Sequence, residues 1–155
     1  MLISEKVETT SPMAAKKYSI LVVDDHQLFR EGLSQMINRE SDLEVCAEAA
    51  DTASALEAMK SHKPDLAIID ISLAGSNGID LIKQIRAADT ETPILVLSMH
   101  DESLYAERAL RSGANGYIMK QEANKKVRDA IRQVLSGEIY LSEKMSAQMV
   151  SKLIS

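Results

Sequence analysis

The sequence predicts an α/β fold in which five parallel strands form one doubly wound sheet, in the order 2-1-3-4-5, followed by a C-terminal helix. Short apolar runs alternate with segments whose apolar residues recur at helical spacing, and this alternation indicates repeated βα units. Residues 66–69 are all apolar, which suits a central strand buried on both faces. Residues 43–49 alternate apolar and polar side chains, which suits an edge strand and favours this strand order.

Proline and glycine mark several of the predicted boundaries. Pro64 and Pro93 precede strands, whereas Gly113 and Gly137 follow helices, whose ends commonly need a left-handed backbone. The predicted strands are 18–23, 43–49, 66–69, 94–97 and 115–119. The predicted helices are 27–38, 53–61, 79–88, 102–112, 122–136 and 143–154.

Two of the predicted helices have features that can be checked in a structure. Asp51 or Thr52 is expected to cap helix 53–61. The last helix carries an apolar stripe at positions i, i+4 and i+8, formed by Met145, Met149 and Leu153. Such a stripe needs a partner, either within the chain or outside it.

The composition limits the class of protein. Of 155 residues, 45% are hydrophobic and 3% aromatic, which predicts one domain with an aliphatic core. A net charge of −5 argues against nucleic-acid binding by this chain itself. The single cysteine, Cys46, fits a reducing compartment, and no apolar run reaches the roughly 18 residues of a membrane helix. We therefore expect a cytoplasmic domain without membrane contact, preceded by a flexible tail of residues 1–17.

Polar residues follow four of the five predicted strands at the point where each strand ends. Asp24 and Asp25 end the first strand, Asp70 the third, Ser98 the fourth and Lys120 the fifth. The carboxyl ends of parallel strands lie at one edge of the sheet, which is where open α/β sheets bind ligands. We therefore expect three carboxylates, a hydroxyl and an amine to converge there.

These residue types together indicate phosphoryl chemistry. Two carboxylates ~4 Å apart repel by about 4 kcal/mol at an effective dielectric near 20, so the cluster favours a divalent cation. Oxygen ligands with positions left for water and phosphate suit Mg²⁺. One carboxylate can then be a nucleophile toward a phosphoryl group, whose oxygens Lys120 and Ser98 would bind. His26 and His100 show no metal-ligand spacing, and we interpret both as structural.

The residues at the strand ends resemble those of a bacterial response regulator receiver domain, whose fold is flavodoxin-like. The matching features are Val22-Val23-Asp24-Asp25, Asp70, Gly78 eight residues later, Ser98 and Lys120. Successive intervals of 45 residues (25 to 70), 28 (70 to 98) and 22 (98 to 120) make the combination specific. The resemblance covers residues 18–137 and implies a receiver domain over that range.

The resemblance implies that Asp70 is the phosphoacceptor for a sensor histidine kinase, with Lys120 and Ser98 assisting the transfer. Ser98 and Tyr117 would be switch residues that move once the phosphoryl group is attached. The added negative charge would then bias the surface around the fourth and fifth strands between two states.

The resemblance also implies a particular set of ligands for Mg²⁺. Asp25, Asp70 and the backbone carbonyl of Ser72 would bind the ion directly. Asp24 would act through a metal-bound water.

A closer resemblance is to the LuxR-type (NarL/FixJ) transcription regulators. It rests on the segments 25–33 (DHQLFREGL), 113–117 (GANGY) and 137–142 (GEIYLS). Those regulators continue into a C-terminal helix-turn-helix domain. We therefore expect residues 138–155 to be a linker toward such a domain, and the chain to be a fragment. Output would pass through a homodimer, and DNA would be bound only by the domain that this chain lacks.

Two alternatives differ from this interpretation. Family members often have proline at the position of Ala74 and a small residue at that of Met99, so the chain is alternatively a phosphorylation-independent interaction module. An enzyme of the same fold, such as a flavoprotein or a hydrolase with an aspartate nucleophile, is disfavoured because neither a glycine-rich phosphate loop nor an Asp-x-Asp nucleophile motif follows the first strand. The leading hypothesis is a signalling module that catalyses only its own phosphorylation and dephosphorylation, not a metabolic enzyme.

Overall fold

The computed structural model describes residues 16–72, 77–100 and 102–154. Residues 1–15 of the predicted tail, and Ala74, lie outside the described residues. The strands are β1 (Tyr18–Val23), β2 (Leu43–Ala49), β3 (Leu66–Asp70), β4 (Ile94–Ser98) and β5 (Gly116–Met119). The helices are α2 (Gln27–Asn38), α3 (Thr52–His62), α4 (Gly78–Ala88), α5 (Glu102–Ser112), α6 (Ala123–Leu135) and α7 (Glu143–Ile154), with a 3-10 turn, η1 (Lys120–Glu122).

The five strands form one parallel sheet in the order β2-β1-β3-β4-β5, which confirms the predicted topology. Every residue of β3 and of β4 is buried, as expected for strands covered on both faces. The pattern of β2 is mixed, with Glu44 and Glu48 exposed, as expected for an edge strand. The burial of the strands agrees with this order, in which β2 lies at an edge of the sheet.

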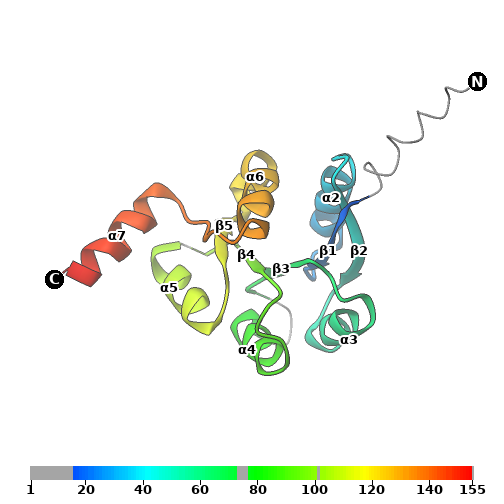
Figure 1. The fold of residues 1–155 in the computed structure, drawn as a ribbon, viewed down its shortest axis with the longest axis horizontal. Helices are drawn as coiled ribbons and strands as arrows, with labels where there is room; N and C mark the ends of the chain where they lie inside the picture. The colour runs from blue at the N-terminus through cyan, green and yellow to red at the C-terminus, as the bar shows by residue number, and fades with distance from the viewer. Residues whose placement is uncertain (1–15, 73–76, 101, 155) are drawn as a thin grey trace, which may run out of the picture.

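Helices cover both faces of the sheet (Figure 1). Helices α2 and α6 lie on one face, and α3, α4 and α5 lie on the other. The apolar residues accordingly form two clusters, and neighbouring residues of β3 belong to different ones: Ile68 packs toward α2 and α6, Ile69 toward α3 and α4. Burying one such apolar side chain stabilises the folded state by about 1.5–3 kcal/mol. A polar residue within a central strand would forgo this stabilisation, so polar residues appear only where the strand ends.

Local signals explain most of the helix boundaries. The carboxylate of Asp51 accepts a hydrogen bond from the backbone N–H of Ser54 at 2.8 Å, so Asp51 caps α3, one of the two residues predicted for that role. Gly113 and Gly137 have positive φ values of 119° and 97°, which confirms both as helix ends. The turn η1 was not predicted, and it delays the start of α6 to Ala123.

The segment that follows α6 is docked onto the domain. Tyr140 lies beside β5 as a parallel bridge, accepting from the N–H of Tyr117 and donating to the carbonyl of Asn115, each at 3.0 Å. Met145 of α7 is 3% exposed and joins the apolar cluster beneath α5, whereas Leu153 is 86% exposed. Helix α7 extends away beyond α5 (Figure 1). The apolar stripe of the last helix therefore has its partner within the chain for its first turns.

In the part of the chain that the structure describes, we find no helix with the length and apolar character of a bilayer-spanning segment.

Candidate functional site

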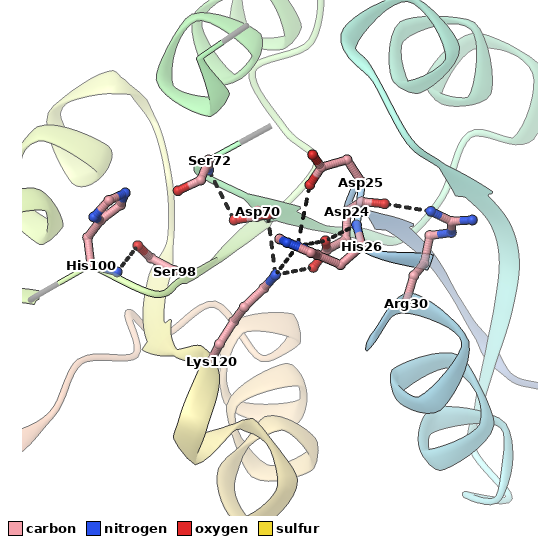
Figure 2. A network of polar contacts seen from close by, with 9 residues as sticks. All are labelled: Asp24, Asp25, His26, Arg30, Asp70, Ser72, Ser98, His100 and Lys120. Carbon is pink, nitrogen blue, oxygen red and sulfur yellow. Dashed lines mark hydrogen bonds and ion pairs between the residues drawn. The ribbon is translucent and has the colours of Figure 1, made fainter. Parts of the chain in front are cut away.

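Three buried charged residues meet at the carboxyl edge of the sheet (Figure 2). Asp24 follows β1 directly, Asp70 is the last residue of β3, and Lys120 follows β5. Their exposed fractions are 1%, 1% and 8%. The apolar strands that end here carry these side chains to one place, as the sequence predicted.

The ammonium of Lys120 lies between two carboxylates. Its Nζ is 2.8 Å from Oδ2 of Asp24 and 3.3 Å from Oδ2 of Asp70. The ring of Phe29 covers it from another side, with the ring centroid 4.5 Å from Nζ. A buried charge is stable only when it is paired, so these contacts compensate one another.

The carboxylate of Asp70 is held in place but remains electrostatically costly. Its Oδ1 accepts a hydrogen bond from the backbone N–H of Ser72 at 3.0 Å. Burial raises the pKa of Asp70, and the charge of Asp24 adds to the effect, while the Ser72 N–H and Lys120 oppose it. Additional positive charge is therefore favourable next to this side chain.

Two residues between β1 and α2 complete the cluster. Asp25 is partly exposed, and the ring Nδ1 of His26 lies 3.5 Å from its Oδ1 and 3.3 Å from Oδ1 of Asp24. Asp24, Asp25, His26 and Asp70 each offer a ligand atom, and these atoms lie within 4.8 Å of one another. The interpretation of His26 as a structural residue missed this placement. Its position directly after Asp25 was the available signal.

The cluster fits a hard divalent cation. Oδ1 of Asp25 is a buried side-chain oxygen that accepts no hydrogen bond from the described residues, and the buried Oδ2 of Asp24 has only the ion pair with Lys120. Carboxylate oxygens in this state are suitable ligands for Mg²⁺, because the ion satisfies lone pairs that hydrogen bonds do not. The backbone N–H of Ser72 hydrogen-bonds Asp70, while the role of the Ser72 carbonyl as a ligand stays a prediction.

Ser98 lies at the end of the neighbouring strand and is fully buried. Its Oγ accepts a hydrogen bond from the backbone N–H of His100 at 2.8 Å. Tyr117, 1% exposed, donates from its hydroxyl to the carbonyl of His100 at 3.2 Å. The two predicted switch residues therefore both contact the connection between β4 and α5.

Two residues outside the cluster position its backbone. Arg30 donates from Nη1 to the carbonyl of Asp24 at 2.7 Å and from Nε to Glu48 at 2.8 Å, which the sequence did not reveal. A Cβ at Gly78 would lie 2.5 Å from Cα of Ile71 and 2.6 Å from the carbonyl oxygen of Asp70. Glycine is thus required where α4 approaches the end of β3.

An apolar groove of about 560 Å³ lies next to Lys120. Its lining includes Leu28, Phe29 and Met99. Leu28 is 84% exposed and Met99 65% exposed, an unusual amount for large apolar side chains. The groove therefore places an apolar surface beside the charged cluster.

Comparison with known proteins places this arrangement in one family. The response regulator receiver domain model matches residues 20–132. The chain is 36% identical over 137 residues to the oxygen regulatory protein NreC of Staphylococcus haemolyticus, covering 88% of this chain and 63% of NreC. It thus spans less than two thirds of the length of that relative.

Solved structures agree with this assignment. A LuxR-family two-component response regulator from Aurantimonas sp. SI85-9A1 superposes with a TM-score of 0.82 at 31% identity, over 90% of this chain and all of that one. The signal receiver domain of a response regulator called NarL from Mycobacterium tuberculosis gives 0.74 at 33% identity, over 79% of this chain and 99% of that one. The chain belongs to the response regulator receiver domain family, whose general function is phosphorylation-activated signalling.

Proposed function

We propose that this domain accepts a phosphoryl group on Asp70 from a sensor histidine kinase, and that the modification switches the output of a NarL/NreC-type regulator. The observation that carries the proposal is the surroundings of Asp70. One of its oxygens is fixed by the N–H of Ser72, and the other faces the ammonium of Lys120. A buried carboxylate with a cation 3.3 Å away can receive a phosphoryl group whose negative charge is already opposed.

In the transfer, an oxygen of Asp70 forms the new bond to phosphorus as the bond from phosphorus to the kinase histidine breaks. Lys120 then pairs with the phosphoryl oxygens, and the Ser98 hydroxyl hydrogen-bonds one of them. Asp25, Asp70 and the carbonyl of Ser72 would hold Mg²⁺, with Asp24 acting through a water. When bound, the ion supplies positive charge to the phosphoryl oxygens.

The switch follows from the two contacts that meet at His100. When Ser98 turns toward the phosphoryl group, it releases the N–H of His100 that it binds at 2.8 Å. The carbonyl of the same residue anchors the hydroxyl of Tyr117. A displacement of His100 therefore reaches Tyr117 and, through its backbone N–H, the docked residue Tyr140.

The apolar groove supports a protein partner at this site. Leu28, Phe29 and Met99 surround the approach to Lys120, and exposed apolar patches of this kind mark interaction surfaces. We assign the groove to the phosphohistidine-bearing domain of the kinase. The same proposal includes dimerisation and DNA binding through a further C-terminal domain, with residues 138–155 as the linker to it. It also includes a cytoplasmic location.

The test is the intact mass of the protein after incubation with a small phosphoryl donor, with and without Mg²⁺. Wild type is expected to gain one phosphoryl group only with Mg²⁺, and Asp70→Asn is expected to gain none. Asp65→Asn is a matched control, because Asp65 lies just before the opposite end of β3 and accepts a hydrogen bond from Ser19. A folded wild type that gains no mass would contradict the proposal.

The exposed Met99 favours one alternative, a receiver-like module that binds its partner without phosphorylation. Its side chain lines the groove beside Lys120, where a small residue would leave more room. The same mass experiment separates the two functions. If Met99→Ala gains the phosphoryl group and wild type does not, Met99 blocks the chemistry and the alternative holds.

A further inference from the structure

The imidazole of His26 lies among the acidic side chains that we assign to the cation. Its Nδ1 is 3.3 Å from Oδ1 of Asp24 and 3.5 Å from Oδ1 of Asp25. The backbone N–H of His26 donates to the same oxygen of Asp24 at 2.8 Å, so the residue is tied to the cluster at two points. Figure 2 shows the ring beside Lys120 and between the two carboxylates.

These spacings are those of atoms that share one metal ion. Ligand atoms about 2.1 Å from an octahedral dication lie about 3.0–4.2 Å from one another. The two distances from Nδ1 to carboxylate oxygens fall within this range, and the four potential ligand atoms lie within 4.8 Å of one another. The ring nitrogen can therefore join the carboxylates around one ion after only a small contraction.

The contacts of Nδ1 show that this ring nitrogen faces the cluster. Nζ of Lys120 lies 3.2 Å from Nδ1, and because an ammonium group can only donate, Nδ1 accepts from it in the tautomer protonated at Nε2. In the other tautomer Nδ1 donates to Oδ1 of Asp24 at 3.3 Å, so in either case the same atom lies against the carboxylates. The ammonium of Lys120 thus already supplies positive charge among these potential ligand atoms, and a dication would take over the charge compensation that it provides.

We propose that His26 is a metal ligand, and that it makes this a mixed nitrogen and oxygen site selective for transition-metal dications of the Co²⁺ and Zn²⁺ class. Imidazole suits these metals, whereas Mg²⁺ prefers oxygen ligands and retains its waters. The inference rests on the proposed function, since it uses the same carboxylates that hold Mg²⁺ there. It adds that a zinc-class ion, held by one more ligand than Mg²⁺, displaces Mg²⁺ from Asp70.

The test is a titration of the full chain with Co²⁺, in which binding is measured by calorimetry and by the visible absorption of the bound ion. A separate titration measures the affinity for Mg²⁺. His26→Ala is expected to weaken Co²⁺ binding by at least about tenfold, since loss of even outer partners of metal ligands costs about 10- to 100-fold. The Mg²⁺ affinity is expected to stay within about twofold, because Mg²⁺ does not use the ring. The absorption of the residual complex is expected to shift to that of an all-oxygen site.

His62→Ala is the matched control, because His62 is exposed on α3 and belongs to no cluster of potential ligands among the described residues. Equal Co²⁺ affinities for wild type and His26→Ala, with Mg²⁺ binding lost in Asp70→Asn, would overturn the role of His26 and leave the proposed function standing. If Asp70→Asn binds both Co²⁺ and Mg²⁺ as tightly as wild type does, both the role of His26 and the proposed function are overturned. Because the side chain of His26 is 60% exposed, its replacement by alanine leaves the fold intact, which circular dichroism checks.

Discussion

The hydroxyl of Tyr117 donates to the backbone carbonyl of His100 across 3.2 Å, from within the buried face of β5. Because the N–H of His100 binds Ser98 at 2.8 Å, a single residue connects the end of β4 to the aromatic ring of the neighbouring strand. His100 is thus held at both its backbone N–H and its carbonyl. A change at Ser98 is therefore expected to reach the anchor of Tyr117.

Tyr117→Phe is expected to lower the free energy of unfolding by about 1 kcal/mol, since it removes a buried donor from the carbonyl of His100. The measurement is urea denaturation followed by circular dichroism. Tyr105→Phe is the control. The centroid of the Tyr105 ring lies 4.8 Å from that of the His100 ring, but it is the hydroxyl of Tyr117, and not that of Tyr105, that donates to the His100 carbonyl. Its effect should stay within about 0.5 kcal/mol. Equal effects of the two variants would exclude the role of the Tyr117 hydroxyl.

Gly78→Ala is expected to destabilise the domain by about 1–3 kcal/mol, because the new Cβ would lie 2.5 Å from Cα of Ile71 and force the end of β3 to move. Gly32→Ala, in the exposed middle of α2, is the opposite case. A Cβ there meets no atom within 4 Å, so the variant should be more stable by about 0.5–1 kcal/mol. Thermal unfolding measures both, and the same sign for the pair would refute the steric argument.

Asp70→Asn is expected to stabilise the metal-free protein at pH 7. The raised pKa of Asp70 means that the native state holds its proton more tightly than the unfolded chain does. Wild-type stability from this group is therefore present at low pH and falls as the pH rises above about 3.8, the ordinary value, through the native pKa. The advantage of the neutral variant should shrink as the pH is lowered toward 4, which denaturation in EDTA at several pH values measures.

Asp89→Asn provides the control of opposite sign. Hydrogen bonds from Thr92 lower the pKa of Asp89, so its contribution is present above the unfolded pKa and is lost as the pH falls through the native one. The variant should be less stable than wild type at pH 7, with the difference disappearing in acid. If both substitutions shift stability in the same direction at pH 7, the argument from burial at Asp70 fails.

Met145→Ala is expected to cost about 2–5 kcal/mol, because it leaves a cavity in the cluster beneath α5. Leu153→Ala, at the exposed end of the same helix, should change the free energy of unfolding by less than about 0.5 kcal/mol. Urea denaturation distinguishes them. Two small effects would mean that α7 is not docked in solution.

The sequence was sufficient for four of the strands because each is a short apolar run with a polar end, and the alternation of apolar and polar residues in 43–49 indicated the edge strand. It located Asp24, Asp70 and Lys120 correctly, since parallel strands bring their ends together whatever the helices do. The burial of residues 66–69 followed from the same run, and Asp70, the fifth residue of β3, is buried as well.

What could not be predicted depends on contacts between distant segments. Nothing in the local pattern shows that Phe29 covers the ammonium of Lys120, or that Arg30 reaches the carbonyl of Asp24. The turn η1 has no periodicity that would reveal it in three residues. His26 was interpreted as structural because metal-ligand spacing was sought along the chain, whereas its neighbours in the cluster include a residue 44 positions away (26 to 70).

The parallel bridge at Tyr140 covers part of the edge of the sheet that β5 would otherwise expose. β5 is the last strand of the sheet, and an uncovered edge strand is a template for pairing with other chains. Tyr140 occupies backbone groups of Asn115 and Tyr117 on that edge. A shorter version ending at Gly137 would leave those groups open, and its monomers would be prone to aggregate by strand addition even though every residue of the site had been kept.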